Sequence, residues 1–158
     1  MKLKKLHFGN FSFGATAGIV TSLALLVGLS RTTKMSVISS LVVLALIDNI
    51  VDTFGIHIYQ ESINPDKKIL RAITTNNFIT RFLITFSFIL LVFFLPIKLA
   101  VIISLILGMC LILLMSFAIS KNHKVNPYPA MLHHLLFAAL VILASNYLGL
   151  WINHIFAN

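Results

Sequence analysis

Acidic residues are scarce in this chain. Its 158 residues include 4 Asp and Glu against 12 Lys and Arg, and charged residues make up 10% of the total. A soluble domain carries about 25% charged residues. With 59% hydrophobic residues and a mean hydropathy of +1.01, the composition excludes an ordinary water-soluble domain and indicates an integral membrane protein.

Cysteine and the motifs of soluble enzymes are also missing. The single Cys110 excludes an intrachain disulfide. The sequence contains no glycine-rich phosphate loop, nucleophile elbow, CxxC or HExxH pattern. We therefore expect neither an enzyme nor a permanently bound cofactor. The net charge of +8 does not indicate nucleic-acid binding, because the basic residues lie between apolar runs, where membrane topology and anionic lipid account for them.

Apolar runs predict the fold. About 20 apolar residues cross a 30 Å hydrocarbon core. Five runs are long enough, at approximately residues 11–30, 35–62, 78–95, 99–119 and 130–151. The sequence therefore predicts one all-α transmembrane domain over residues 1–158, a bundle of five membrane-spanning helices.

Basic residues set the expected orientation, since cytoplasmic loops are enriched in Lys and Arg. With a cytoplasmic N-terminus, nine basic residues lie inside: Lys2, Lys4, Lys5, Lys67, Lys68, Arg71, Arg81, Lys121 and Lys124. Three lie outside: Arg31, Lys34 and Lys98. This count favours an outside C-terminus, and the short loops favour a prokaryotic inner membrane. Arg71 and Arg81 are expected to flank the third helix and reach lipid phosphates.

The second run holds three of the four acidic residues, Asp48, Asp52 and Glu61. A carboxylate near the bilayer centre costs roughly 2.5–3.5 kcal/mol on insertion scales, so an idle one is expensive. At helical spacing Asp48 and Asp52 share a face, while His57 and Glu61 form an i, i+4 pair on another side. The pattern predicts a polar path or cation site in the membrane.

Oxygen ligands suit Fe²⁺, Mn²⁺ and other hard divalent cations. Asp48 and Asp52 are the main candidate metal ligands, with His57 and Glu61 as candidates near the inner interface. Either aspartate could carry a proton instead. Alternatively, the acids could hydrogen-bond polar groups on neighbouring helices and fix packing alone.

The first run carries small residues at a spacing of four, Gly14, Gly18 and Ser22. Such a ridge lets two helix backbones approach closely. We predict a homodimer that packs through the first two helices and is surrounded by membrane lipids. The adjacent His133 and His134 open the last run, where placement at the interface explains them better than metal binding.

The order of features resembles the vacuolar iron transporter family. The resemblance rests on FGATAGIVTSLALLVGLS (13–30), then DNIVDTFGIHIYQES (48–62), then a basic segment and three further spans. It implies a five-helix dimer with a cytoplasmic N-terminus and a metal path between subunits. It also implies that the substrate is Fe²⁺ or a similar divalent cation, moved in exchange for protons.

This sequence departs from the family pattern in three places. Ala17-Gly18 stands where the family usually has Asp-Gly, and Asp52 stands at the usual Met position when Gly55 is aligned. The segment NPDKKILRAITTNN (64–77) replaces an acidic, Met-bearing metal-binding domain. A divalent-cation transporter is still the expected function. The alternatives are a non-transporting scaffold whose buried acids specify helix packing, or an intramembrane aspartyl-type enzyme that pairs acids across a dimer axis.

Overall fold

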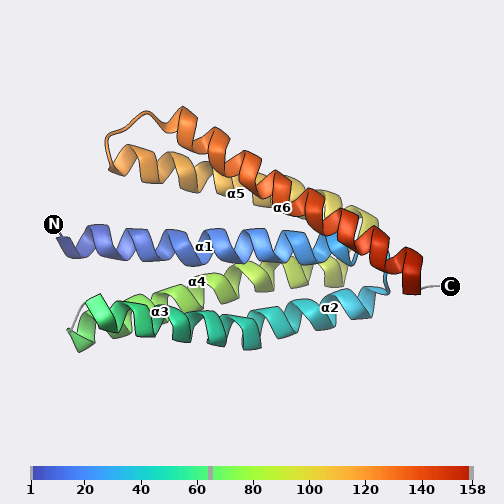
Figure 1. Cartoon of the computed structure of the whole chain (residues 1–158), viewed down its shortest axis with the longest axis horizontal. Coiled ribbons are helices and arrows are strands. Elements are labelled where there is room, and N and C mark those ends of the chain that lie inside the picture. Colours follow the sequence, from blue (N-terminus) through green and yellow to red (C-terminus); the bar gives the residue numbers. More distant parts are fainter. Residues whose placement is uncertain (1, 64–65, 157–158) are drawn as a thin grey trace.

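The computed structural model describes residues 2–63 and 66–156, with side chains described from residue 14 onward. The chain is a helical bundle (Figure 1). Its elements are α1 (Lys2–Gly28), α2 (Lys34–Val43), the π-helical segment η1 (Leu44–Asp48), α3 (Asn49–Ile63), α4 (Lys67–Phe94), α5 (Ile97–Asn122) and α6 (Pro127–Phe156). The described residues contain no strand, so the predicted all-α class is confirmed.

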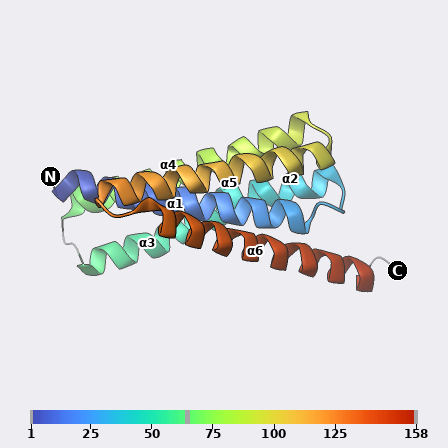
Figure 2. The ribbon, with the colours of Figure 1, turned by 90° about the horizontal axis from the view of Figure 1, so that it is seen from above.

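Four helices are long and apolar enough to cross a membrane: Lys34–Ile63, in which α2, η1 and α3 are continuous, and α4, α5 and α6. The fully described apolar part of α1, Gly14–Gly28, is shorter. The helices run alternately up and down. The N-terminus, the α3–α4 connection and the α5–α6 loop lie at one end, and the C-terminus lies at the other (Figures 1 and 2).

Helix α4 begins at Lys67, well before the residue 78 that the sequence predicts. Asp66 caps it by accepting hydrogen bonds from the backbone amides of Lys68 and Ile69, at 2.9 and 3.4 Å. Residues at helical spacing in this segment are buried, including Leu70 and Ile73. The polar stretch expected as a loop is therefore mostly the first turns of α4, stabilised by its buried face.

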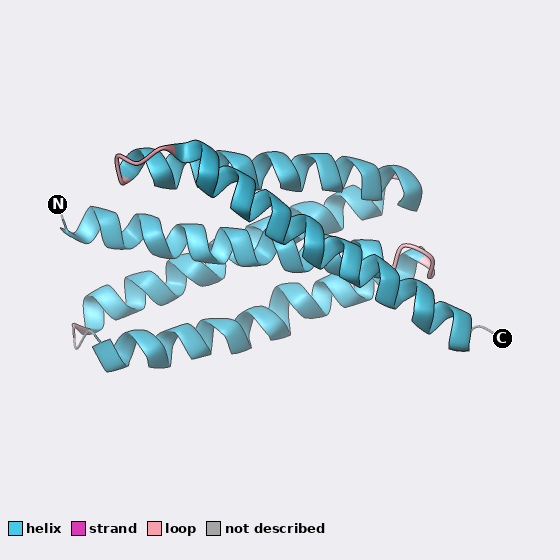
Figure 3. Ribbon diagram, turned by 45° about the horizontal axis from the view of Figure 1, so that its top comes forward, coloured by secondary structure: helices cyan, strands magenta, loops and turns pink. Residues whose placement is uncertain are grey.

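Helix α1 lies centrally and packs against α4, α5 and α6. One apolar cluster joins these four helices, with Leu23, Phe88 and Ile112 at its centre. A second cluster joins α1 to α2 and α4 around Leu26 and Leu41. Helix α6 crosses the bundle at an angle (Figure 3). Most of its large apolar side chains are exposed. The apolar perimeter is the surface expected of a lipid-embedded protein.

The small-residue ridge of α1 packs inside the chain. A methyl group added to Gly18 would lie 3.2 Å from Cγ of Arg81 and 3.4 Å from its Cα, and Ser22 donates a 3.2 Å hydrogen bond to Thr85. The prediction that this ridge forms the dimer interface is therefore wrong, because α4 of the same chain covers it. The three contacts repeat every four residues on both helices: Gly14 with Asn77, Gly18 with Arg81, and Ser22 with Thr85.

A second close crossing joins the ends of α1 and α6. A methyl group on Gly149 would lie 2.1 Å from the carbonyl oxygen of Gly28. One turn earlier, Ser145 donates a 2.6 Å hydrogen bond to the carbonyl oxygen of Ala24. The backbones of α1 and α6 are therefore in close contact here, as small residues permit in membrane helices.

Gly149→Ala is expected to lower stability by about 1–3 kcal/mol, because the new methyl group forces α6 away from α1. Thermal unfolding of the purified protein measures the loss. Gly55→Ala is the matched control, since a methyl group there meets nothing within 4 Å. Equal unfolding temperatures for the two variants would contradict the crossing.

Candidate functional site: a charged seam between α3 and α4

Arg81 joins both aspartates of the second span. Its Nη2 donates a hydrogen bond to Oδ2 of Asp48, and its Nη1 forms an ion pair with Oδ2 of Asp52. The arginine side chain is 4% exposed, whereas Asp48 is 48% and Asp52 31% exposed. The prediction that Arg81 flanks its helix and reaches lipid phosphates is therefore wrong. It lies within α4 and holds α3.

The local helix geometry places these acids. Asp48 and Asp52 are one turn apart, so both carboxylates reach the same guanidinium. Asp48 is also the last residue of the π-helical segment Leu44–Asp48. Such segments are rare and occur frequently at functional sites. The wider turn directly precedes the charged cluster.

A ladder of buried polar side chains continues beside this cluster along α3 and α4. Asn77 donates to Thr53, and Thr53 donates to the side-chain oxygen of Asn49, each at 3.4 Å. Asn49 in turn donates a 3.0 Å hydrogen bond to the carbonyl oxygen of Phe78. Asn49 and Asn77 are fully buried. The ladder ties the two helices together through polar rather than apolar contacts.

His57 extends the ladder toward the α3–α4 connection. Its Nδ1 lies 3.3 Å from Oγ1 of Thr74, which donates its hydrogen to the carbonyl oxygen of Leu70 at 2.8 Å. Because a hydroxyl group has one hydrogen, Nδ1–H of His57 is the donor to Thr74. Within the described part of the chain no ion pair joins His57 to Glu61. Glu61 is exposed, so the predicted pairing of these two residues is not formed.

Several polar atoms in the seam have no hydrogen-bond partner. They are Oδ1 of Asn77 and Nε of Arg81; elsewhere in the described residues the same is true of Oγ of Ser104. Oδ2 of Asp52 has only its ion pair with Nη1 of Arg81. Buried polar groups normally find partners, and those that do not call for an explanation. The seam, meaning the Asp48–Arg81–Asp52 cluster with Asn49, Thr53 and Asn77, therefore contains hydrogen-bonding atoms that the pairing of α3 with α4 does not use.

A lateral hollow reaches Asp48 from the α1–α2 side. It encloses about 320 Å³ and is lined by Leu25, Ser39, Ser40, Val43, Leu44 and Asp48. Two serine hydroxyls thus lie on the side of Asp48 away from the ladder. Polar groups follow the second span on both sides of the charged cluster.

The predicted metal ligands do not gather in one chain. Among the side chains of residues 14–63 and 66–156, no group of three or more His, Cys, Asp and Glu residues is placed to hold a metal ion. Asp48 and Asp52 meet at Arg81, whereas His57 bonds Thr74 on α4. Any metal bound here would need ligands beyond this pair of acids.

No family model, curated protein or solved structure matches this chain. Its site is therefore interpreted from its own geometry.

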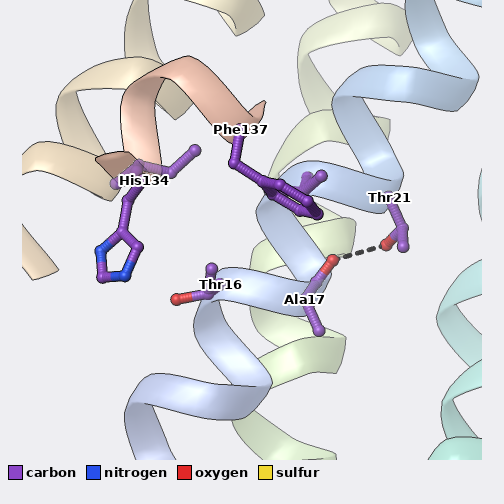
Figure 4. A pocket seen from close by; sticks show the side chains of 7 residues that line it. Thr16, Ala17, Thr21, His134 and Phe137 are labelled. Atoms are coloured by element: carbon purple, nitrogen blue, oxygen red, sulfur yellow. Dashed lines mark hydrogen bonds between the residues drawn. The ribbon is translucent and has the colours of Figure 1, made fainter. Parts of the chain in front are cut away.

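Ala17, where the resemblance expects an aspartate, faces away from the seam. It lines a separate cavity of about 260 Å³ between α1, α5 and α6, together with Thr16, Thr21, His134 and Phe137 (Figure 4). Gly18, the next residue, is the one that contacts Arg81. An acid at position 17 would therefore not reach the Asp48–Arg81–Asp52 cluster of its own chain.

The two histidines of α6 lie apart from the seam. Nδ1 of His134 lies 2.7 Å from Oγ of Ser116. The ring centroids of His133 and His134 are 5.9 Å apart, and the two ring planes are tilted relative to each other. Both side chains are exposed. Neither histidine joins the charged cluster.

Proposed function

We propose that this chain is an integral membrane transporter for cations, with Fe²⁺ or Mn²⁺ as the substrate class and protons as the exchanged ion. The observation that carries the proposal is the Asp48–Arg81–Asp52 cluster halfway along an apolar helix. Asp48 lies at the middle of the 30-residue helix Lys34–Ile63. Charged groups at such a depth are costly and mark ion pathways.

Polar groups on both sides of the cluster support a path. The ladder of Asn49, Thr53 and Asn77 leads toward His57 at one end. The serine-lined hollow approaches Asp48 from the other. Asn49, Thr53 and Asn77 are buried between α3 and α4, so they support the charged cluster from its inner side, while a cation on the outer side meets the carboxylates of Asp48 and Asp52.

The exposed side of the acids supports a homodimer. Large apolar side chains surround them on this face, including Ile47, Val51 and Phe54. Half-exposed carboxylates facing lipid would be unfavourable, whereas a second copy of the chain would cover them. Two aspartates and one arginine leave one net negative charge per chain and two per dimer, which matches a divalent cation. The path would then run between subunits, along the continuous α2–η1–α3 helix.

The proposed topology has five spans, including α1, with a cytoplasmic N-terminus in a prokaryotic inner membrane. Moving Arg81 into the helix reduces the inner basic count from nine to eight, still against three outside. The positive-inside rule therefore favours the same orientation. The resemblance to vacuolar iron transporters agrees with this arrangement, and the chain has no catalytic role in the proposal.

One observation favours a second function. Both aspartates already have a cationic partner in Arg81, as they would in a scaffold whose acids only fix helix pairing. The unpartnered atoms of Asn77 and Arg81 weigh against this alternative. If these residues served only to pack the helices, we would expect each buried polar atom to have a hydrogen-bond partner.

Ion flux in reconstituted vesicles tests the proposal, with Fe²⁺, Mn²⁺ and H⁺ assayed separately. Asp48→Asn and Asp52→Asn are each expected to reduce cation flux by about tenfold or more, which corresponds to a barrier higher by roughly 1.4 kcal/mol. Glu61 is exposed near the end of α3 and lies outside the Asp48–Arg81–Asp52 cluster, so the proposed path does not use it. Glu61→Gln removes the same charge and should therefore keep most of the flux. Wild-type rates in both aspartate variants would remove these residues from the mechanism. Absence of flux from a folded wild-type dimer would support the scaffold.

A further inference from the structure

Arg81 is buried, while its two acidic partners are partly exposed. Its side chain is 4% exposed, and its stem packs against the Gly18 position of α1. Asp48 and Asp52 are 48% and 31% exposed on the outer side of α3. If the ion pairs open, the carboxylates are the groups that can move outward.

The charge of Arg81 is also permanent. A guanidinium group stays protonated in proteins, so it cannot leave the acids by losing a proton. It bridges Asp48 and Asp52 from inside the bundle. A cation that uses both carboxylates must therefore take them from the guanidinium.

We propose that Arg81 limits the affinity of the site: it is a tethered cation that competes with the transported cation for Asp48 and Asp52. This inference rests on the proposed cation transport. Substrate arriving from the exposed side of α3 draws the carboxylates outward, and on release they return to Arg81. The empty site is then never left with two unpaired carboxylates in hydrocarbon, and substrate binding stays weak enough for release.

Mn²⁺-dependent thermal unfolding of the full chain in detergent tests the competition. A ligand that binds the folded state stabilises it according to its concentration and affinity, so even a destabilised variant reports binding. Arg81→Gln is expected to need at least about tenfold less Mn²⁺ than wild type for the same stabilisation, a difference of roughly 1.4 kcal/mol in binding. Arg81→Lys, which keeps a tethered charge, should resemble wild type. Arg71→Gln, which removes an exposed arginine from the same helix, is the control.

A double variant repeats the test with one carboxylate. Arg81→Gln with Asp48→Asn should bind Mn²⁺ more tightly than Asp48→Asn alone, because both variants keep only Asp52 and only the single variant keeps the guanidinium. Affinity in Arg81→Gln equal to or weaker than wild type, or in the double variant equal to or weaker than Asp48→Asn, would overturn the inference. Failure of the transport proposal appears separately, as absent flux in wild-type vesicles, whatever the Mn²⁺ response of these variants.

Discussion

Replacing Gly18 by leucine is expected to abolish stable folding of the bundle. At this position a single methyl group would already lie 3.2 Å from Cγ and 3.4 Å from Cα and the carbonyl oxygen of Arg81. Two of these contacts are to backbone, which cannot turn aside as a side-chain end can. Overpacking a core typically costs about 1–3 kcal/mol, and we expect a leucine here to exceed that range. The yield of monodisperse protein and its thermal unfolding measure the effect.

Gly55→Leu is the matched control for this prediction. A methyl group at Gly55 meets nothing within 4 Å, and the residue is exposed on α3. The fold of the single chain should therefore tolerate leucine at this position, and any effect should be confined to assembly or flux. If Gly18→Leu unfolds at the same temperature as Gly55→Leu, the close α1–α4 packing is contradicted.

Removing Arg81 alone is expected to cost about 3–5 kcal/mol of stability when divalent cations are chelated, because two acids lose their buried partner. Neutralising the whole cluster should recover most of this loss, since Asp48→Asn, Asp52→Asn and Arg81→Gln together leave no unpaired charge. Equilibrium unfolding in mixed detergent compares the single variant with the triple variant and wild type.

The two outcomes of this comparison have different consequences. Recovery in the triple variant, with flux lost, would mean that the charges serve transport and that the fold does not require them. If the single variant were as stable as wild type, the ion pairs would contribute nothing to holding α3 against α4. Arg81, the most buried charged side chain of the cluster, would then not contribute to the stability of the fold.

The helical class and the acidic part of the site could be predicted from sequence. Apolar run length predicts membrane helices, and the insertion cost of Asp48 and Asp52 marks them as functional candidates. Apolar run length does not predict the start of α4 because its first turns are polar on average, although Leu70, Ile73 and Asn77 recur on one buried face. Asp66 as a helix cap was the available signal.

The spacing of residues along the sequence does not predict which residues of different helices contact each other. The Gly14, Gly18 and Ser22 pattern predicts a close approach but does not say whether the neighbour is α4 or another subunit. The sequence predicts Arg81 at the lipid interface because the apolar run 78–95 is shorter than the helix, which begins at Lys67. Its four-residue spacing from Asn77 and Thr85 could have indicated a buried polar face. The crossing of Gly28 and Gly149 joins residues too distant in sequence for any local pattern to relate them.

The π-helical segment Leu44–Asp48 also bears on how this site compares with one on a regular helix. A π turn accommodates about one residue more than the α-helical turn it replaces. The wider turn absorbs the extra residue, so deleting one residue within it would restore a regular helix while α2 and α3 keep their orientations. Asp52 would then still face Arg81. A relative with a regular helix can therefore carry the same Asp52–Arg81 pair, and its alignment with this chain would need a one-residue gap here.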